Sequence, residues 1–157
     1  MQWDEVGNLA KIIMLIGEYN HTLDDKNRVS LPAKFRKEMG KSVVLAPGFD
    51  ACVSIFTMAE WKKFAERLTS DSSQLESDRR KLNRVWFGQA SQVDVDSLGR
   101  ILVPETLKER ASLKSKVVVV GVQDRAEIWN EERWSEYKAQ AEGQADMLAD
   151  ALGQKGV

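Results

Sequence analysis

One ten-residue signature occurs twice in this chain and limits what the rest of the sequence can form. Residues 23–32 read LDDKNRVSLP and residues 95–104 read VDSLGRILVP, so an aspartate, an arginine and a proline return in register after 72 residues. A second echo follows each copy: the Ile-Phe pair at 55–56 and the Ile-Trp pair at 128–129 are 73 residues apart, and each precedes a further tryptophan. Self-similarity of this kind marks a duplicated structural unit. The chain therefore consists of two copies of one unit.

The size of the unit decides how the two copies must fold. Each unit has about 55 residues, a length at which the fraction of surface that can be buried is too small for a secure core. Two units packed against each other would share one core. The chain of 157 residues, 43% of them hydrophobic, is then most simply one globular domain.

The apolar pattern predicts the same order of elements in both units. A strand leads into the signature, which forms a hairpin because its turn position is Asn27 in one copy and Gly99 in the other, residue types that tolerate positive φ. A short helix begins at the proline, a second hairpin follows, and a helix capped by Thr57 or Asn130 closes the unit. The expected elements are 17–23, 29–31, 32–39, 43–45, 52–56 and 58–68 in the first unit and 90–95, 101–103, 104–110, 117–122, 126–129 and 131–141 in the second.

These elements indicate an α+β domain with a defined division of the chain. An N-terminal extension has no counterpart in the repeat and is expected to be disordered or peripheral, and the residues after the last helix are expected to form a flexible tail. The predicted segments are the extension at 1–13, the first repeat at 14–71, a linking helix within 72–87, the second repeat at 88–141 and the tail at 142–157.

Composition excludes several classes of protein. No apolar stretch is long enough to cross a bilayer and the acidic N-terminus is unlike a signal peptide, so a cytoplasmic protein without a membrane partner is expected. Cys52, expected to be buried, is the only cysteine and His21 the only histidine, which leaves no disulfide, no metal-ligand set and no paired nucleophile. We expect no cofactor and no bound metal. An enzyme that uses Asp24, Asp25 or Asp96 as acid–base groups is a weak hypothesis, because no histidine, cysteine or metal-ligand set accompanies these carboxylates.

Several short motifs together resemble a known family. They are GEYN at 17–20, LDDKNR at 23–28, PAKFR at 32–36, GQAS at 88–91, DSLGRI at 96–101 and EIW at 127–129. As a set they are similar to the motifs of the MraZ family of bacterial transcription regulators, over about residues 14–141.

The resemblance implies both a fold and a function. The fold would be a pair of duplicated half-barrel units forming a double-split β-α-β, swapped-hairpin AbrB-like barrel with peripheral helices, and chains would assemble into a closed homo-oligomeric ring, an octamer as the first guess. The function would be sequence-specific binding of double-stranded DNA at direct repeats in the promoter of the cell-division and cell-wall gene cluster. Repression is the implied outcome, and the protein would be associated with the nucleoid.

The charge around the first signature favours DNA more than the charge of the whole chain does. The formal net charge is −1, yet six basic residues accompany only three acidic ones between residues 24 and 41. Several such segments on one ring would bind repeated DNA elements with gained avidity. The expected DNA-binding residues are Asp24, Lys26, Arg28, Lys34, Arg36, Asp96 and Arg100. The two signature arginines would reach phosphates or guanine edges, the aspartates would orient them, and the others would contact phosphates.

Other interpretations of these residues stay open. Arg28 and Arg100 could pair only with the aspartates of their own hairpins and touch no DNA. Leu98, beside the second turn, favours a contact between subunits for that loop, and the basic residues at 79–84 favour a solvated helix face or a subunit interface. The alternative function is a ring-forming scaffold or antitoxin-like module that binds an acidic protein through the same loops.

Overall fold

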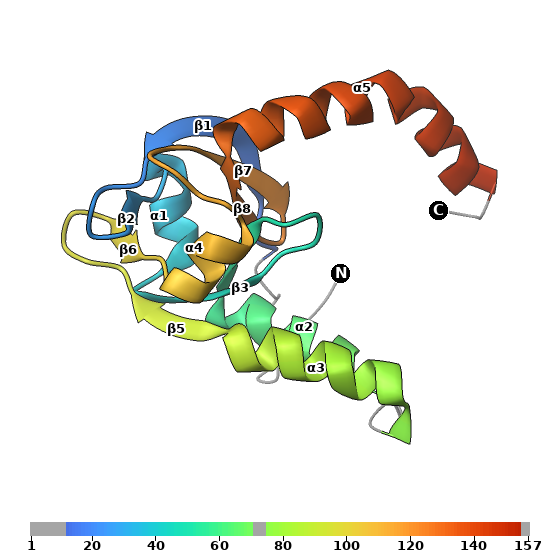
Figure 1. Ribbon diagram of the computed structural model, residues 1–157, viewed down its shortest axis with the longest axis horizontal. Helices are drawn as coiled ribbons and strands as arrows, with labels where there is room; N and C mark the ends of the chain where they lie inside the picture. Colours follow the sequence, from blue (N-terminus) through green and yellow to red (C-terminus); the bar gives the residue numbers. More distant parts are fainter. Residues whose placement is uncertain (1–11, 71–74, 155–157) are drawn as a thin grey trace.

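The computed structural model describes residues 12–70 and 75–154, which form eight strands and five helices (Figure 1). The first unit contains β1 (Leu15–Thr22), β2 (Arg28–Ser30), α1 (Ala33–Met39), β3 (Ser42–Pro47), β4 (Val53–Thr57) and α2 (Met58–Thr69), and α3 (Ser77–Gln89) links it to the second. The second unit contains β5 (Ser91–Asp94), β6 (Arg100–Leu102), α4 (Glu105–Arg110), β7 (Lys116–Gln123), β8 (Ala126–Asn130) and α5 (Glu131–Gln154). The α+β class and the repeated order of elements are confirmed.

The larger sheet is symmetric under exchange of the two units. Its six strands lie in the order β1-β7-β8-β4-β3-β5, and all neighbours are antiparallel. Because β5, β3 and β4 correspond to β1, β7 and β8 in the repeat, exchange of the units turns this order into its own reverse. The centre is the β4–β8 pair, where Ser54 lies opposite Glu127, its counterpart at the 73-residue offset. An approximate two-fold axis therefore relates the halves of one chain.

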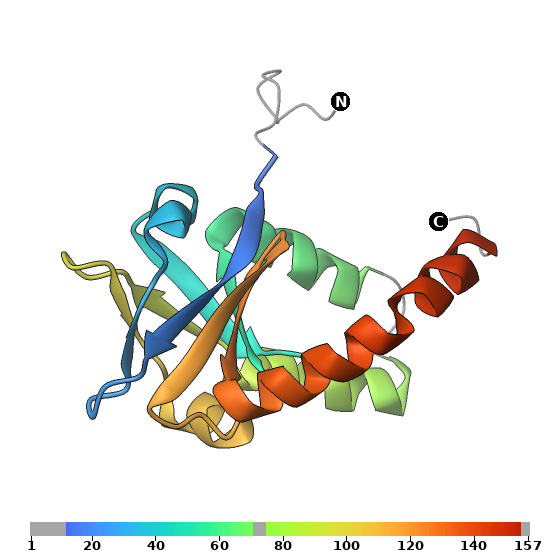
Figure 2. The ribbon, with the colours of Figure 1, turned by 90° about the horizontal axis from the view of Figure 1, so that it is seen from above.

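Strands are exchanged between the two units in both sheets. The smaller sheet is the antiparallel pair β2–β6, centred on Val29 opposite Ile101, its counterpart at the 72-residue offset. In the larger sheet β1 pairs along its whole length with β7 of the other unit, and β5 pairs with β3 (Figure 2). Neither sheet is therefore complete within a single unit.

One hydrophobic core is built by both units, as the size of the unit predicts. Its fully buried side chains include Leu45 and Ile55 from the first unit and Ile101, Leu107 and Ile128 from the second. Burial of each such side chain contributes about 1.5 to 3 kcal/mol. Loss of either unit would expose the apolar side chains of the other.

The larger sheet does not close into a barrel among the described strands. β1 and β5 each have one neighbour and are its edges. The predicted barrel is therefore not seen as a closed ring of hydrogen-bonded strands, because the outer edges of β1 and β5 are not paired with each other.

Side-chain caps begin the two closing helices, as predicted. Thr57 Oγ1 accepts a hydrogen bond from the Glu60 backbone N–H at 3.1 Å, and Asn130 Oδ1 accepts one from the Arg133 N–H at 3.1 Å. The predicted helix end at Ala141 is wrong, since α5 continues to Gln154 and includes most of the predicted tail. Alanine, glutamine, leucine and methionine are strong helix formers and outweigh the two glycines of α5, Gly143 and Gly153. Residues 155–157 lie outside the described residues.

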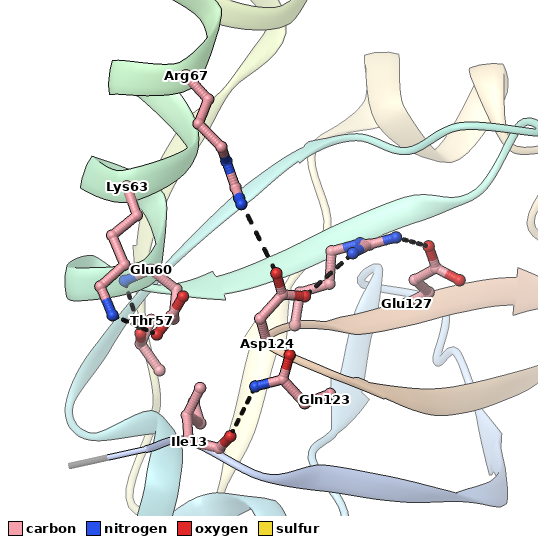
Figure 3. A network of polar contacts seen from close by, with 9 residues as sticks. Ile13, Thr57, Glu60, Lys63, Arg67, Gln123, Asp124 and Glu127 are labelled. Carbon is pink, nitrogen blue, oxygen red and sulfur yellow. Dashed lines mark hydrogen bonds and ion pairs between the residues drawn. The ribbon is translucent and has the colours of Figure 1, made fainter. Parts of the chain in front are cut away.

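The predicted boundary of the N-terminal extension is one residue too late. Ile13 is only 7% exposed and belongs to the core, whereas Ile12 is 71% exposed. The Ile13 carbonyl also accepts a 3.0 Å hydrogen bond from Gln123 Nε2, at the end of β7 (Figure 3). Ile13 therefore belongs to the packed domain, and residues 1–11 of the predicted extension lie outside the described residues.

An ionic network joins α2 of the first unit to the β7–β8 turn of the second. Asp124 lies 3.9 Å from Arg67 and 3.1 Å from Arg125, whose other terminal nitrogen lies 3.2 Å from Glu127 (Figure 3). The Glu127 carboxylate also accepts a hydrogen bond from Trp129 Nε1 at 3.2 Å. These contacts add a polar link between the units on the face of the sheet opposite the shared core.

Candidate nucleic-acid interface

The first hairpin is organised by a single carboxylate. Asp24 Oδ1 accepts hydrogen bonds from the backbone N–H groups of Lys26, at 2.9 Å, and Arg28, at 2.8 Å. Asp24 Oδ2 accepts a third from Arg28 Nε at 2.9 Å. A short polar side chain that bonds its own backbone a few residues later stabilises a turn, so Asp24 fixes both the loop and the direction of the Arg28 side chain.

The second hairpin repeats this geometry. Asp96 Oδ1 accepts hydrogen bonds from the N–H groups of Leu98, at 2.9 Å, and Arg100, at 2.8 Å, and Asp96 Oδ2 accepts one from Arg100 Nε at 2.8 Å. The predicted pairing of each arginine with its own aspartate is confirmed. The pairing uses Nε alone, and within residues 12–70 and 75–154 no hydrogen bond occupies the two terminal nitrogens of either arginine. Each guanidinium is therefore held while its outer edge stays available.

Hydrogen bonding keeps both carboxylates ionised. The Arg28 backbone N–H, followed by its side chain and the Lys26 N–H, lowers the pKa of Asp24 below its ordinary value of 3.8. The Arg100 and Leu98 N–H groups and the Arg100 side chain lower the pKa of Asp96 in the same way. Neither carboxylate is suited to act as a general base near neutral pH, because a strong acid holds its charge and accepts protons poorly.

The two turn residues take the conformation that the sequence predicts. Asn27 has φ of 61° and Gly99 has φ of 77°. The side chain of Arg36 lies against Gly99 and donates to the Leu31 carbonyl at 3.1 Å. Lys108, the counterpart of Arg36 at the 72-residue offset, donates to Asn27 Oδ1 at 2.9 Å. In each case a basic side chain from one unit supports the turn of the other.

Lys108 and its neighbour Glu105 are site residues that the sequence analysis missed. Asn27 Nδ2 donates to Glu105 Oε2 at 2.8 Å, so the first turn is held by two residues of α4. The repeat itself contains the signal, because Lys108 stands where Arg36 stands in the first unit. Applying the offset to every predicted residue would have identified it.

The structure brings both hairpins to one end of the molecule. The Leu31 N–H donates to the Gly99 carbonyl at 2.9 Å and the Val103 N–H donates to the Asn27 carbonyl at 2.8 Å, so each turn is bonded to the strand of the other unit. Figures 1 and 2 both show the β1–β2 and β5–β6 loops projecting at the end of the molecule away from α3 and the C-terminal part of α5. Lys26 is exposed on the first loop, and Lys34 and Arg36 are exposed on α1.

The two halves of this end differ in charge and polarity. Residues 24–41 include six basic and three acidic side chains. The equivalent segment, residues 96–113, includes three basic and three acidic side chains. Leu98 is 62% exposed at the position of Lys26, and Leu102 is 53% exposed at the position of Ser30. The first hairpin therefore has the surface that suits a polyanion, while the second is neutral and more apolar.

Other chemistry has little support in the described part of the chain. Among residues 12–70 and 75–154 no group of three or more His, Cys, Asp and Glu side chains is placed to hold a metal ion. Cys52 is 1% exposed, as predicted, and burial raises the pKa of its thiol far above its usual range. In the same residues no helix is long and apolar enough to span a membrane.

Comparison with known proteins gives a consistent result. The profile of the family described as "MraZ protein, putative antitoxin-like" matches the chain at residues 14–84 and again at 86–154, one match on each unit. The chain is 39% identical over 146 residues to the transcriptional regulator MraZ of Clostridium acetobutylicum, which covers 92% of this chain and 100% of that relative. It is 40% identical over 139 residues to the protein of the same name from Moorella thermoacetica, covering 88% and 96% of the two chains.

Proposed function

The chain belongs to the MraZ family, and from this premise we propose that it is a transcriptional regulator that binds double-stranded DNA through its paired hairpins. The observation that carries the proposal is the geometry of Arg28. Its Nε is bonded to Asp24, its side chain is 32% exposed, and no residue of the described ranges hydrogen-bonds its two terminal nitrogens, on a loop that also carries the exposed Lys26. A guanidinium fork held in this way can form two parallel hydrogen bonds to a phosphate or to the O6 and N7 atoms of guanine.

The two hairpins would have different parts in this function. The basic surrounding of Arg28, with Lys34 and Arg36 on the neighbouring helix, supports a direct DNA contact by the first hairpin. The exposed Leu98 beside Arg100 supports a role at a contact between subunits, or at a thymine methyl group, for the second. Asp24 and Asp96 act as positioning residues in both cases.

The finer features of the proposal come from the family resemblance. They are a swapped-hairpin, AbrB-like architecture, a homo-oligomeric ring with eight subunits as the first guess, direct repeats in the promoter of the cell-division and cell-wall gene cluster, repression, and association with the nucleoid in the cytoplasm. The exchanged pairs β1–β7 and β2–β6 support the first of these. Binding through several modest basic surfaces at once agrees with the net charge of −1, because avidity replaces strong single contacts.

The decisive experiment measures DNA binding and folding of the same variants. A duplex selected by the wild-type protein from a random-sequence pool serves as the probe, in forms with one or several copies of the selected element. Arg28→Ala should weaken binding by about 1 to 3 kcal/mol per occupied site and lower the slope of log Kd against log salt. Arg28→Lys should recover the salt slope but not the sequence preference, because lysine keeps the charge without the fork.

Two comparisons make the result interpretable. Lys62→Ala, at an exposed position on α2, is the matched control that removes one positive charge elsewhere and should leave binding unchanged. Circular dichroism should show that Arg28→Ala remains folded, since a partly exposed ion pair contributes little to stability. If Arg28→Ala binds the selected duplex as tightly as the wild type at near-physiological salt, Arg28 only stabilises its own hairpin and does not contact DNA.

A protein partner is the second candidate function, in keeping with the description of the family as antitoxin-like. The exposed Leu98 and Leu102 favour it, because apolar side chains on a projecting loop suit a protein surface better than a phosphate backbone. Capture of an acidic protein that survives excess competitor DNA, with no selection of any DNA sequence, would establish this alternative.

A further inference from the structure

The C-terminal half of α5 projects from the body of the molecule (Figure 1). Residues 142–154 carry three acidic side chains, Glu142, Asp146 and Asp150, and no lysine or arginine. Met147, Leu148 and Leu152 on this segment are 50 to 70% exposed. A projecting helix that combines acidic and apolar side chains has the character of a segment that packs on another surface.

That segment has an apolar stripe with the spacing of a packing helix. Ala141, Ala145, Leu148 and Leu152 recur at intervals of four, three and four residues, which places them on one face. Glu142 lies beside this stripe, and Asp146 and Asp150 lie progressively further round the helix toward the opposite face. Two such helices would repel each other because neither carries a compensating positive charge, so self-pairing of α5 is disfavoured.

A complementary surface lies along α3. A hollow of about 390 Å³ is lined by Arg80, Asn83, Arg84, Phe87 and Gly88. Asn83 is 6% exposed, and among the described residues neither its amide oxygen nor its amide nitrogen has a hydrogen-bond partner. A buried amide without hydrogen-bond partners destabilises the folded state. A chain docked in the hollow could supply those partners to Asn83.

Charge and length indicate which segment fits the hollow along α3. α3 carries four basic residues, Arg79, Arg80, Lys81 and Arg84, against the single acidic Asp78. Both α3 and the projecting segment of α5 are 13 residues long, about 20 Å at the helical rise. The alanines and glycines of α5 permit a close approach of the two backbones. Glutamines at 144 and 154 provide amides of the kind that Asn83 could pair with.

We propose that the acidic C-terminal half of α5 in one copy of the protein docks into the hollow along α3 of the next copy. The contact is head-to-tail, since donor and acceptor surfaces differ, and repetition of a head-to-tail contact closes a ring where the rotation permits. The inference rests on the proposed assembly of copies into a ring and identifies one contact that holds it. The hairpins lie at the other end of the molecule and remain uncovered.

Charge exchange on the full-length protein tests this contact. Arg84→Glu with Lys81→Glu on α3, or Glu142→Lys with Asp146→Lys on α5, should each raise the concentration for half-assembly by about tenfold or more, measured by sedimentation velocity. The protein carrying all four substitutions should recover assembly because the charges are again complementary. Lys62→Glu on α2 and Glu136→Lys on the proximal part of α5 are the matched controls and should assemble as the wild type does.

The outcomes separate this inference from the function proposed above. If the wild type assembles and neither charge-reversed protein is impaired, the α5–α3 contact is wrong while the ring stands. The contact is also wrong if both charge-reversed proteins are impaired in assembly and the protein with all four substitutions does not recover it. A wild-type protein that stays monomeric at all concentrations would overturn the ring itself. If the α3 variant assembles normally but loses affinity for DNA, the basic face of α3 is a phosphate-binding surface instead of a docking site.

Discussion

Replacement of Gly99 by alanine should destabilise the protein through two separable effects. Gly99 has φ of 77°, a conformation that costs an L-residue about 1 to 2 kcal/mol. An added Cβ would also overlap Nε and Cζ of Arg36, whose displacement breaks its bond to the Leu31 carbonyl and costs about 0.5 to 1.5 kcal/mol. The expected loss is about 1.5 to 3.5 kcal/mol, or about 5 to 10 °C in Tm for a chain of this size.

Urea unfolding of the wild type, Gly99→Ala, Arg36→Ala and the double variant separates the two effects. Arg36→Ala in the Gly99→Ala background removes the overlap but not the backbone strain, so the double variant should be more stable than additivity of the single changes predicts. Asn27→Gly, the matched change at the equivalent turn, should stay within about 0.5 kcal/mol of the wild type, because glycine adopts the φ of 61° without strain and this offsets the loss of one exposed and one partly buried hydrogen bond. An unchanged free energy of unfolding for Gly99→Ala would refute the assignment of both effects. Strict additivity would refute the contact with Arg36.

Two further predictions concern other parts of the molecule. Ile13→Ala should lower the free energy of unfolding by about 2 to 4 kcal/mol because the side chain lies in the core, whereas the exposed Ile12→Ala should be neutral; equal stabilities in urea would contradict the boundary at Ile13. His21 should make stability fall from pH 7 to pH 5, because burial, with a smaller effect of Arg36, lowers its pKa below 6.5 and the unfolded chain takes up a proton first. The His21→Gln protein should show a shallower fall, and identical pH profiles would contradict this.

The duplication is why much of the fold could be predicted from one sequence. Each strand or helix that was expected in one unit had a counterpart in the other, so two weak patterns supported each assignment. Asn27 and Gly99 illustrate this, since neither residue alone specifies a hairpin, but both tolerate positive φ at the same position. The caps Thr57 and Asn130, predicted from their residue types, also stand at equivalent positions of the two units.

The repeat did not predict which strands pair with each other or what structure the segments outside the repeat adopt. A strand pattern records which face is buried and not which strand lies alongside, so the pairing of β1 with β7 does not follow from the residues of β1. Gly143 reads as an end of α5 when the sequence is considered locally, although helix formers on both sides carry the helix through it. The Arg36–Gly99 contact joins residues of different units, and no local pattern contains it.

The strand exchange also sets the order in which the protein can mature on the ribosome. β1 pairs with β7, so it has to wait until synthesis has passed Gln123, about 5 to 20 s at ordinary elongation rates. During that interval the nascent first unit exposes an unpaired strand edge and half of an apolar core, the features that lead to aggregation or engage chaperones. We expect that a single unit does not fold stably alone, because both sheets and the core need strands and side chains of the other unit. Folding is therefore expected to be all-or-none and to begin only after nearly the whole chain has been made.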